Sequence, residues 1–245
     1  MLAIKPYRRA HAVEYARRWA LSRNALFTAF DALGGDCTNF VSQCLFAGCC
    51  VMNGTPTFGW YYRAPGDYAP AWTGVVYLHQ FLTTNMDVGP VGIEIPPESA
   101  EMGDVIQLAR ADGTYYHSLL VSGMRDGIPL VCAHDNDALD RPLDSYTYDT
   151  ARAIHITGVR VRIPGGACCY QGMLSGTSIF PDADSAAMLS CTGVGADPAD
   201  DEPSDPEASD EEVVQTQDVP RDELPPDFAL PQRTETDELR AAPGS

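Results

Sequence analysis

Apolar positions recur every three or four residues in three stretches of the chain, which is the spacing of an amphipathic helix. The first stretch covers residues 7–24 and combines one apolar face with an arginine-rich face. The second follows Cys37, and the third covers residues 75–83. The pattern therefore predicts three helices. The first should dock on the domain through its apolar face and leave its arginines in solvent.

Other stretches alternate apolar and polar side chains, as strands with one buried face do. They cover residues 105–109, 115–121, 128–134 and 153–163. The turn signal Arg125-Asp126-Gly127 separates the second of these from the third, so we expect these two to form an antiparallel hairpin. Helices together with an antiparallel sheet predict an α+β fold.

A cysteine stands at the predicted start of the second helix. In the run Gly34-Gly35-Asp36-Cys37 the glycines permit a tight turn, and Asp36 has the chemistry of an N-cap. The unpaired N–H groups and the positive dipole of a first turn favour thiolate, so Cys37 is expected to have a low pKa and is a candidate nucleophile. The same N–H groups are candidates to bind an oxyanion. The alternative is that Cys37 is one more small buried residue.

A cysteine nucleophile needs a base, which the fold can bring from far away in the sequence. His117 is the best candidate, because the alternation of its strand places it in phase with apolar Leu119 and Val121. An imidazole on such a face would meet a helix packed on the sheet. The alternative is a histidine that only packs and hydrogen-bonds in the core.

The following strand offers a group to orient that imidazole. His134 and Asn136 share one phase and would lie beside His117, where a polar partner fixes the tautomer of a catalytic histidine. The residues alone leave His134 and Asn136 as competing assignments. Asp135 is expected to point the other way, and Asp137 to lie in a loop.

Seven short motifs resemble one known family. They are DCTNFVSQCL, GWYY, AWTGV, GDVIQL, YHSLLV, AHDND and RPLDSY, and they lie in the family's order between about residues 7 and 164. In these motifs the chain resembles the bacterial putative amidase domain, a papain-like group related to the CHAP and NlpC-type cysteine amidases. Ala71, where serine is usual, is a departure from the pattern.

The resemblance implies a papain-like α+β fold, with a cysteine-bearing helix packed on an antiparallel sheet that carries the histidine. It also implies hydrolysis of amide bonds, often in cell-wall peptides, with a peptide or muropeptide-like substrate and no cofactor. By position Cys37 matches the nucleophile, His117 the base and His134 the orienting residue, with Asn136 as the competing assignment.

The mechanism that follows begins with a Cys37 thiolate and a His117 imidazolium and passes through an acyl-enzyme. Asp36 and Asn39 are candidate helpers in substrate binding, or simply capping residues of the helix start. Two other functions compete with hydrolysis. One is a non-catalytic module that binds peptide or cell-wall fragments, and the other is an acyltransferase that uses the same dyad.

Aromatic residues gather in residues 54–80 among prolines and glycines. Trp60 and Trp72 are the best candidates for the wall of a substrate groove, since aromatic side chains in loops often line binding sites. The alternative is that they cover the core of a loop-rich domain.

Charge divides the chain into a domain and a tail. Residues 197–245 carry sixteen acidic and three basic side chains, which is −13 of the total net charge of −18. This proline-rich segment is expected to be disordered. The organisation predicted is an amidase-like domain over residues 1–164, an unassigned extension over 165–196 and the acidic tail over 197–245. The acidity argues against nucleic-acid binding.

The eight cysteines and the N-terminal residues bear on location. No secretory signal or membrane span is visible in the sequence, so a cytoplasmic location with free thiols is the expectation. Action on the cell wall would then require non-classical export or release from the cell. No metal site is expected, because the chain lacks a Cys-x-x-Cys pair. A metal held by His117, His134 and Asp137 would leave Cys37 unexplained. The oligomeric state is left open.

Overall fold

The computed structural model describes residues 2–162 and 169–179. All of these belong to one compact unit, which lies within residues 1–200. Its helices are α1 (Arg9–Trp19), α2 (Cys37–Cys49), α3 (Pro70–Thr73), α4 (Val75–Thr84) and α5 (Tyr170–Ser175), with 3-10 turns η1 (Pro97–Ser99) and η2 (Leu143–Ser145). The three predicted helices are confirmed, although the first is shorter than its pattern suggested.

The strands form one large antiparallel sheet and one small hairpin. They are β1 (Ala3–Lys5), β2 (Tyr62–Ala64), β3 (Asp67–Tyr68), β4 (Gly89–Ile95), β5 (Val105–Ala109), β6 (Tyr115–Arg125), β7 (Ile128–Ala133), β8 (Ala138–Pro142) and β9 (Thr150–Val161). The large sheet has the order β1-β9-β5-β6-β7-β8, with β4 also paired to β9, while β2 and β3 pair with each other. The α+β class is therefore confirmed.

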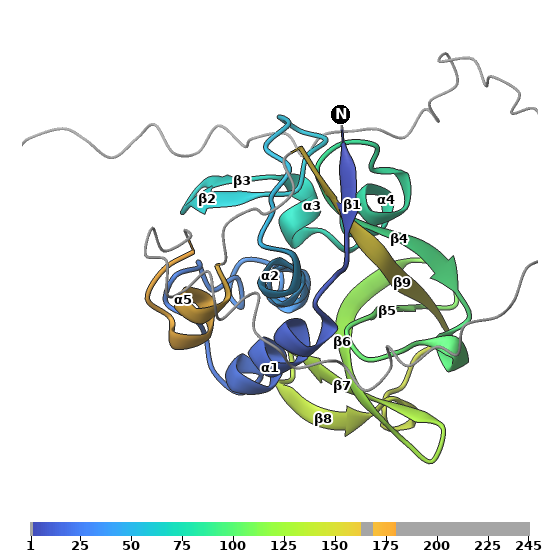
Figure 1. Ribbon diagram of the computed structural model, residues 1–245. Coiled ribbons are helices and arrows are strands. Elements are labelled where there is room, and N and C mark those ends of the chain that lie inside the picture. Colours follow the sequence, from blue (N-terminus) through green and yellow to red (C-terminus); the bar gives the residue numbers. More distant parts are fainter. Residues whose placement is uncertain (1, 163–168, 180–245) are drawn as a thin grey trace, which may run out of the picture. The chain divides into compact units, whose positions relative to one another are not determined.

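Helix α2 is buried along its whole length, and Figure 1 shows it beside α1 at one side of the curved sheet. Its side chains pack with those of α1, α3, α4 and the facing strands in a single apolar cluster. A second cluster covers the other face of the sheet and includes Ile106, Leu119 and Val131. Because both ends of α2 are enclosed, its first residue is held in a fixed place relative to β6.

The β6–β7 hairpin contains a bulge that determines which residue after β7 lies opposite His117. Its turn is as predicted, with Arg125 paired to Ile128 and left-handed backbone at Asp126 and Gly127. The register then shifts between Val121 and Gly123, which leaves Ser122 as an extra residue in β6. A bulge of this kind moves every later side chain of one strand relative to its partner strand by one position.

Arginines of α1 do not simply face solvent as expected. The guanidinium of Arg9 lies 2.6 Å from the carboxylate of Asp104. Asp104 directly precedes β5 and is fully buried. Arg17 pairs with Asp140 in β8 at 3.1 Å. These ion pairs fasten α1 to the sheet, in addition to the apolar face that packs on α2.

A disulfide joins Cys50, directly after α2, to Cys169, directly before α5. The expectation that all cysteines are free is therefore wrong for this pair, because the fold brings together two residues 119 positions apart. Cys37, Cys44, Cys49 and Cys132 are free and buried. Through the disulfide, α5 is attached to the end of the helix whose other end carries Cys37.

Several predictions lie outside the described residues. They concern the acidic tail over 197–245 and the extension over 165–196, of which only residues 169–179 are described. Among the described residues, no helix is long and apolar enough to cross a membrane.

Candidate active site

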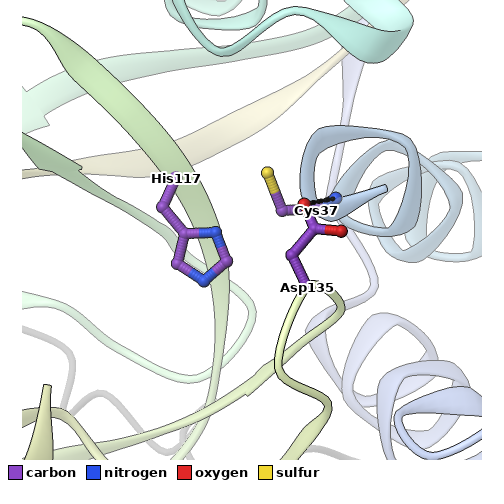
Figure 2. Close-up of side chains that lie close together, drawn as sticks. All are labelled: Cys37, His117 and Asp135. Atoms are coloured by element: carbon purple, nitrogen blue, oxygen red, sulfur yellow. Dashed lines mark hydrogen bonds between the residues drawn. The ribbon is translucent and has the colours of Figure 1, made fainter. Parts of the chain in front are cut away.

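Three chemically active side chains converge where α2 begins. Cys37 is the first residue of α2, His117 lies in β6, and Asp135 follows the end of β7. One ligand atom from each, the thiol sulfur, an imidazole nitrogen and a carboxylate oxygen, lie within 4.8 Å of one another. Figure 2 shows the three side chains pointing toward one another from these separate segments. The structure thus brings Cys37 and His117 together and adds Asp135.

The carboxylate of Asp135 binds the N-terminus of α2. The backbone N–H of Asp36 donates to it at 2.8 Å and that of Cys37 at 3.1 Å. The first N–H groups of a helix have no partner within the helix, so they are free to bind a carboxylate. The negative charge is also favourable at the positive end of the helix dipole. Gly35 permits this approach, because a Cβ at that position would lie 2.6 Å from Asp135 Oδ2. Asp36 makes no capping hydrogen bond with its own side chain.

The expectation that Asp135 points away is wrong, for two reasons in the backbone. First, the bulge at Ser122 changes the phase: Leu120 pairs with Cys132, and continuing this register places Asp135, rather than Asn136, opposite His117. Second, the strand ends at Ala133, and Asp135 and Asn136 are left-handed, with φ of 62° and 72°. Asp and Asn tolerate this conformation better than most residues, so the Asp-Asn-Asp run was the available signal.

Burial controls the charge of the two reactive groups. It raises the pKa of the Cys37 thiol to about 11, and the nearby Asp135 carboxylate acts in the same direction. Burial also lowers the pKa of His117, although Asp135 partly opposes this. The predicted low pKa of Cys37 is therefore wrong for this resting state. The helix N-terminus cannot favour the thiolate as expected, because Asp135 already occupies its first N–H groups.

His134 is engaged elsewhere. It is buried, its Nδ1 lies 2.5 Å from Asp36 Oδ2, and its Nε2 lies 3.0 Å from the carbonyl oxygen of Trp19. Both ring nitrogens are therefore engaged with oxygen atoms of other residues. Its ring also stacks on Phe40. Because both nitrogens are occupied, His134 does not orient His117, and the expectation that it does is wrong. The reason is the register shift at Ser122, which places Asp135 opposite His117.

The other predicted orienting residue, Asn136, lies exposed in the left-handed turn. Asp137 beside it pairs with Arg23 at 2.9 Å. Since Asp137 pairs with Arg23 and both nitrogens of His134 are engaged, the structure does not favour a metal site made of His117, His134 and Asp137. In the part of the chain that the structure describes, the group able to hold a metal is Cys37, His117 and Asp135.

The predicted substrate-binding residues belong to the core. Trp60 and Trp72 are fully buried, and their indole N–H groups donate to Ser42 Oγ at 2.9 Å and to Asn39 Oδ1 at 2.8 Å. The expectation that they wall a groove is therefore wrong, because they fill the space beside α2. Asn39 in turn donates to Asp36 Oδ1 at 2.9 Å. Asp36 and Asn39 thus support the helix start from inside.

Aromatic and basic side chains surround His117 on the sheet. The rings of Tyr116 and Tyr146 both lie 6.2 Å from its imidazole, and the guanidinium of Arg141 lies 4.0 Å from the Tyr146 ring centre. The hydroxyl of Tyr146 is buried. Sequence reasoning missed Asp135, Arg141 and Tyr146, since only the folded register places them near His117.

Comparison with known proteins finds a family match over the larger part of the chain. The sequence model of a family described as putative amidase domain matches residues 6–157. The uncharacterized protein YhbB of Bacillus subtilis (strain 168) is 32% identical over 137 residues, which are 54% of this chain and 42% of YhbB. The chain thus spans less than half the length of this relative. No solved structure matches the chain, and its likeness to papain-like enzymes stays a prediction.

Proposed function

The chain belongs to the putative amidase domain family, and we propose that it hydrolyses an amide bond with Cys37 as nucleophile and His117 as general base. The observation that carries the proposal is the convergence of thiol, imidazole and carboxylate at the start of a buried helix. A nucleophile beside a base, on rigid elements, is the arrangement that covalent catalysis needs. The family name points to the same reaction class.

The reaction starts from a neutral pair. Burial holds the pKa of Cys37 up and that of His117 down, so a thiol faces an imidazole at neutral pH. His117 takes the thiol proton as Cys37 attacks the carbonyl carbon, and then gives a proton to the leaving amine. Water, activated by His117, hydrolyses the resulting thioester and releases the acid.

Asp135 has two parts in this scheme. In the resting site it holds the Cys37 N–H, which is a natural donor to the developing oxyanion, so an incoming carbonyl oxygen must displace the carboxylate. Once His117 carries a proton, the same negative charge stabilises the imidazolium, in line with its effect on the pKa of His117. Asp135 therefore replaces His134 and Asn136 as the third member of the site.

The substrate we propose is a peptide or muropeptide-like amide, because the motifs resemble the bacterial putative amidase domain and this resemblance implies amide hydrolysis, often in cell-wall peptides. An acyltransferase differs only in the final acceptor. A binding module on the same fold would have no use for a thiol next to an imidazole, and this makes it the weaker alternative.

The test is turnover of a panel of peptide p-nitroanilides and of soluble muropeptides, with product acids identified by mass spectrometry. Wild type should release acid and amine. Cys37→Ser and His117→Ala should each lose at least a hundredfold in kcat/KM, the usual size of a general-base contribution. His79→Ala is the matched control, because His79 bonds Glu94 away from the site and should leave turnover unchanged.

An added amine separates hydrolase from transferase. Free acid as the main product in the presence of a competing amine supports the hydrolase, and a dominant amine adduct would reassign the chain as a transferase. Equal turnover by wild type and Cys37→Ser would remove the thiol from the mechanism.

A further inference from the structure

We propose that Cys37, His117 and Asp135 form a binding site for one zinc ion, and that the bound ion holds the amidase inactive. The inhibitory part rests on the proposed function, whereas the binding part does not. The ligands come from the start of α2, from β6 and from the turn after β7. Nothing in the spacing along the sequence predicts them as a set.

The geometry suits zinc. Thiolate, imidazole and carboxylate are its usual protein ligands, at about 2.0–2.3 Å from the metal, which puts tetrahedral donors about 3.5 Å apart. Here the three donor atoms lie within 4.8 Å of one another. Closing them around an ion therefore needs shifts of about 1 Å or less. Three protein ligands leave one position for water, the coordination of an open zinc site.

The charges also match. A thiolate, a carboxylate and a neutral imidazole carry two negative charges, which one zinc ion neutralises in a largely buried place. The imidazole of His117 would bind the ion in its neutral form, as a metal ligand must. Zinc binds the thiolate, so the thiol proton of Cys37 leaves to solvent as the metal binds. The new bond is Zn–S, and no oxidant or reductant takes part.

The surroundings preorganise the ligands. The two N–H groups that hold Asp135 fix the direction of its carboxylate beside Cys37. Thr38 Oγ1 lies 3.8 Å from the Cys37 sulfur and bonds Ser118 Oγ at 3.0 Å, which ties the thiol to the strand of His117. Such outer partners typically change metal affinity by about 10–100-fold.

Zinc bound here would remove both catalytic functions at once. The thiolate would be bonded to the metal and no longer able to attack a carbonyl, and the His117 nitrogen would hold no free lone pair for the thiol proton. Removal of the ion would return the neutral pair of the resting site. The activity of the proposed amidase would therefore depend on the free zinc concentration.

The experiment is equilibrium dialysis of the full chain against Zn²⁺ at pH 8, with proton release measured in weak buffer. Wild type should bind one ion more than Cys37→Ser does and release about one proton for that ion. Asp135→Asn should weaken the binding at least tenfold. Asp137→Asn is the matched control, because its carboxylate pairs with Arg23, and its affinity should equal that of wild type.

Equal zinc stoichiometry in wild type, Cys37→Ser and His117→Ala would overturn the inference, as would unchanged affinity in Asp135→Asn. Circular dichroism of each variant verifies that it is folded. The two proposals can fail separately. Amide turnover without site-specific zinc binding overturns only the zinc site, and zinc binding without turnover of any amide supports the zinc site while removing the proposed hydrolase.

Discussion

At the scale of single residues, the site is governed by one carboxylate. Asp135 accepts the first N–H groups of α2 and adds to the burial that raises the pKa of Cys37 to about 11. The usual argument that a helix N-terminus activates cysteine assumes that those N–H groups are free to face the sulfur. Here they are occupied, so the thiol is protonated in the resting site.

Asp135→Asn should therefore make Cys37 more acidic. The amide keeps one acceptor for the helix N–H groups but removes the negative charge, and the pKa of Cys37 should fall by about one unit. The measurement is the pH dependence of Cys37 alkylation by iodoacetamide, read by peptide mass spectrometry. Asp137→Asn should leave the midpoint where it is in wild type. An unchanged midpoint in Asp135→Asn would refute the role given to this charge.

His134→Ala should destabilise the fold. It removes the hydrogen-bond partner of Asp36 and leaves a buried carboxylate with Arg23 at 3.5 Å, so we expect the free energy of unfolding to fall by about 3 kcal/mol. Urea unfolding measures it. Asn136→Ala, in the exposed turn, should change the free energy of unfolding by less than about 0.5 kcal/mol. Similar losses in the two variants would contradict the structural role of His134.

At the scale of elements, most of the sheet could be predicted from the sequence and the site only in part. Alternation located β5, β6 and β7 because each has one buried face, and the Arg125-Asp126-Gly127 signal located the turn. The bulge at Ser122 has no local signature, yet it decides whether Asp135 or Asn136 faces His117. A one-residue shift is invisible to periodicity but exchanges the two faces of a strand.

The disulfide is the second element-level feature that patterns could not show. Cys50→Ser combined with Cys169→Ser should lower the free energy of unfolding by about 2–4 kcal/mol, because the bond closes a loop of more than a hundred residues in the unfolded chain. Reductant should destabilise wild type by a similar amount and leave the double variant unaffected. Equal sensitivity of both proteins to reductant would mean that this bond does not stabilise α5 against α2.

At the scale of the whole molecule, several buried acids keep their protons in the folded state. Burial raises the pKa of Cys37 to about 11 and that of Cys49 to about 12, and raises the pKa of Cys44 well above its usual value. An unfolded chain loses these protons near pH 8.5. Above that pH the folded state binds more protons than the unfolded one, so stability must fall as pH rises.

Between roughly pH 9 and 11 the free energy of unfolding should fall by about 1.4 kcal/mol per pH unit for each thiol, or about 4 kcal/mol per pH unit for the three together. Urea unfolding at several pH values measures it. Cys44→Ala should show a slope smaller by one thiol's share. A free energy of unfolding that stays constant from pH 8 to 10.5 would show that these thiols are not protonated in the folded protein.

In the proposed reaction Cys37 forms an acyl-enzyme with the help of His117. The most direct measurement is acid quenching of the enzyme during turnover of an amide from the panel, followed by mass spectrometry of the peptide that contains Cys37. We expect a thioester on Cys37 in wild type, with the mass of the acyl group, and greatly reduced acylation in His117→Ala. Turnover with no acyl group on Cys37, or with the acyl group on Cys132 instead, would contradict it.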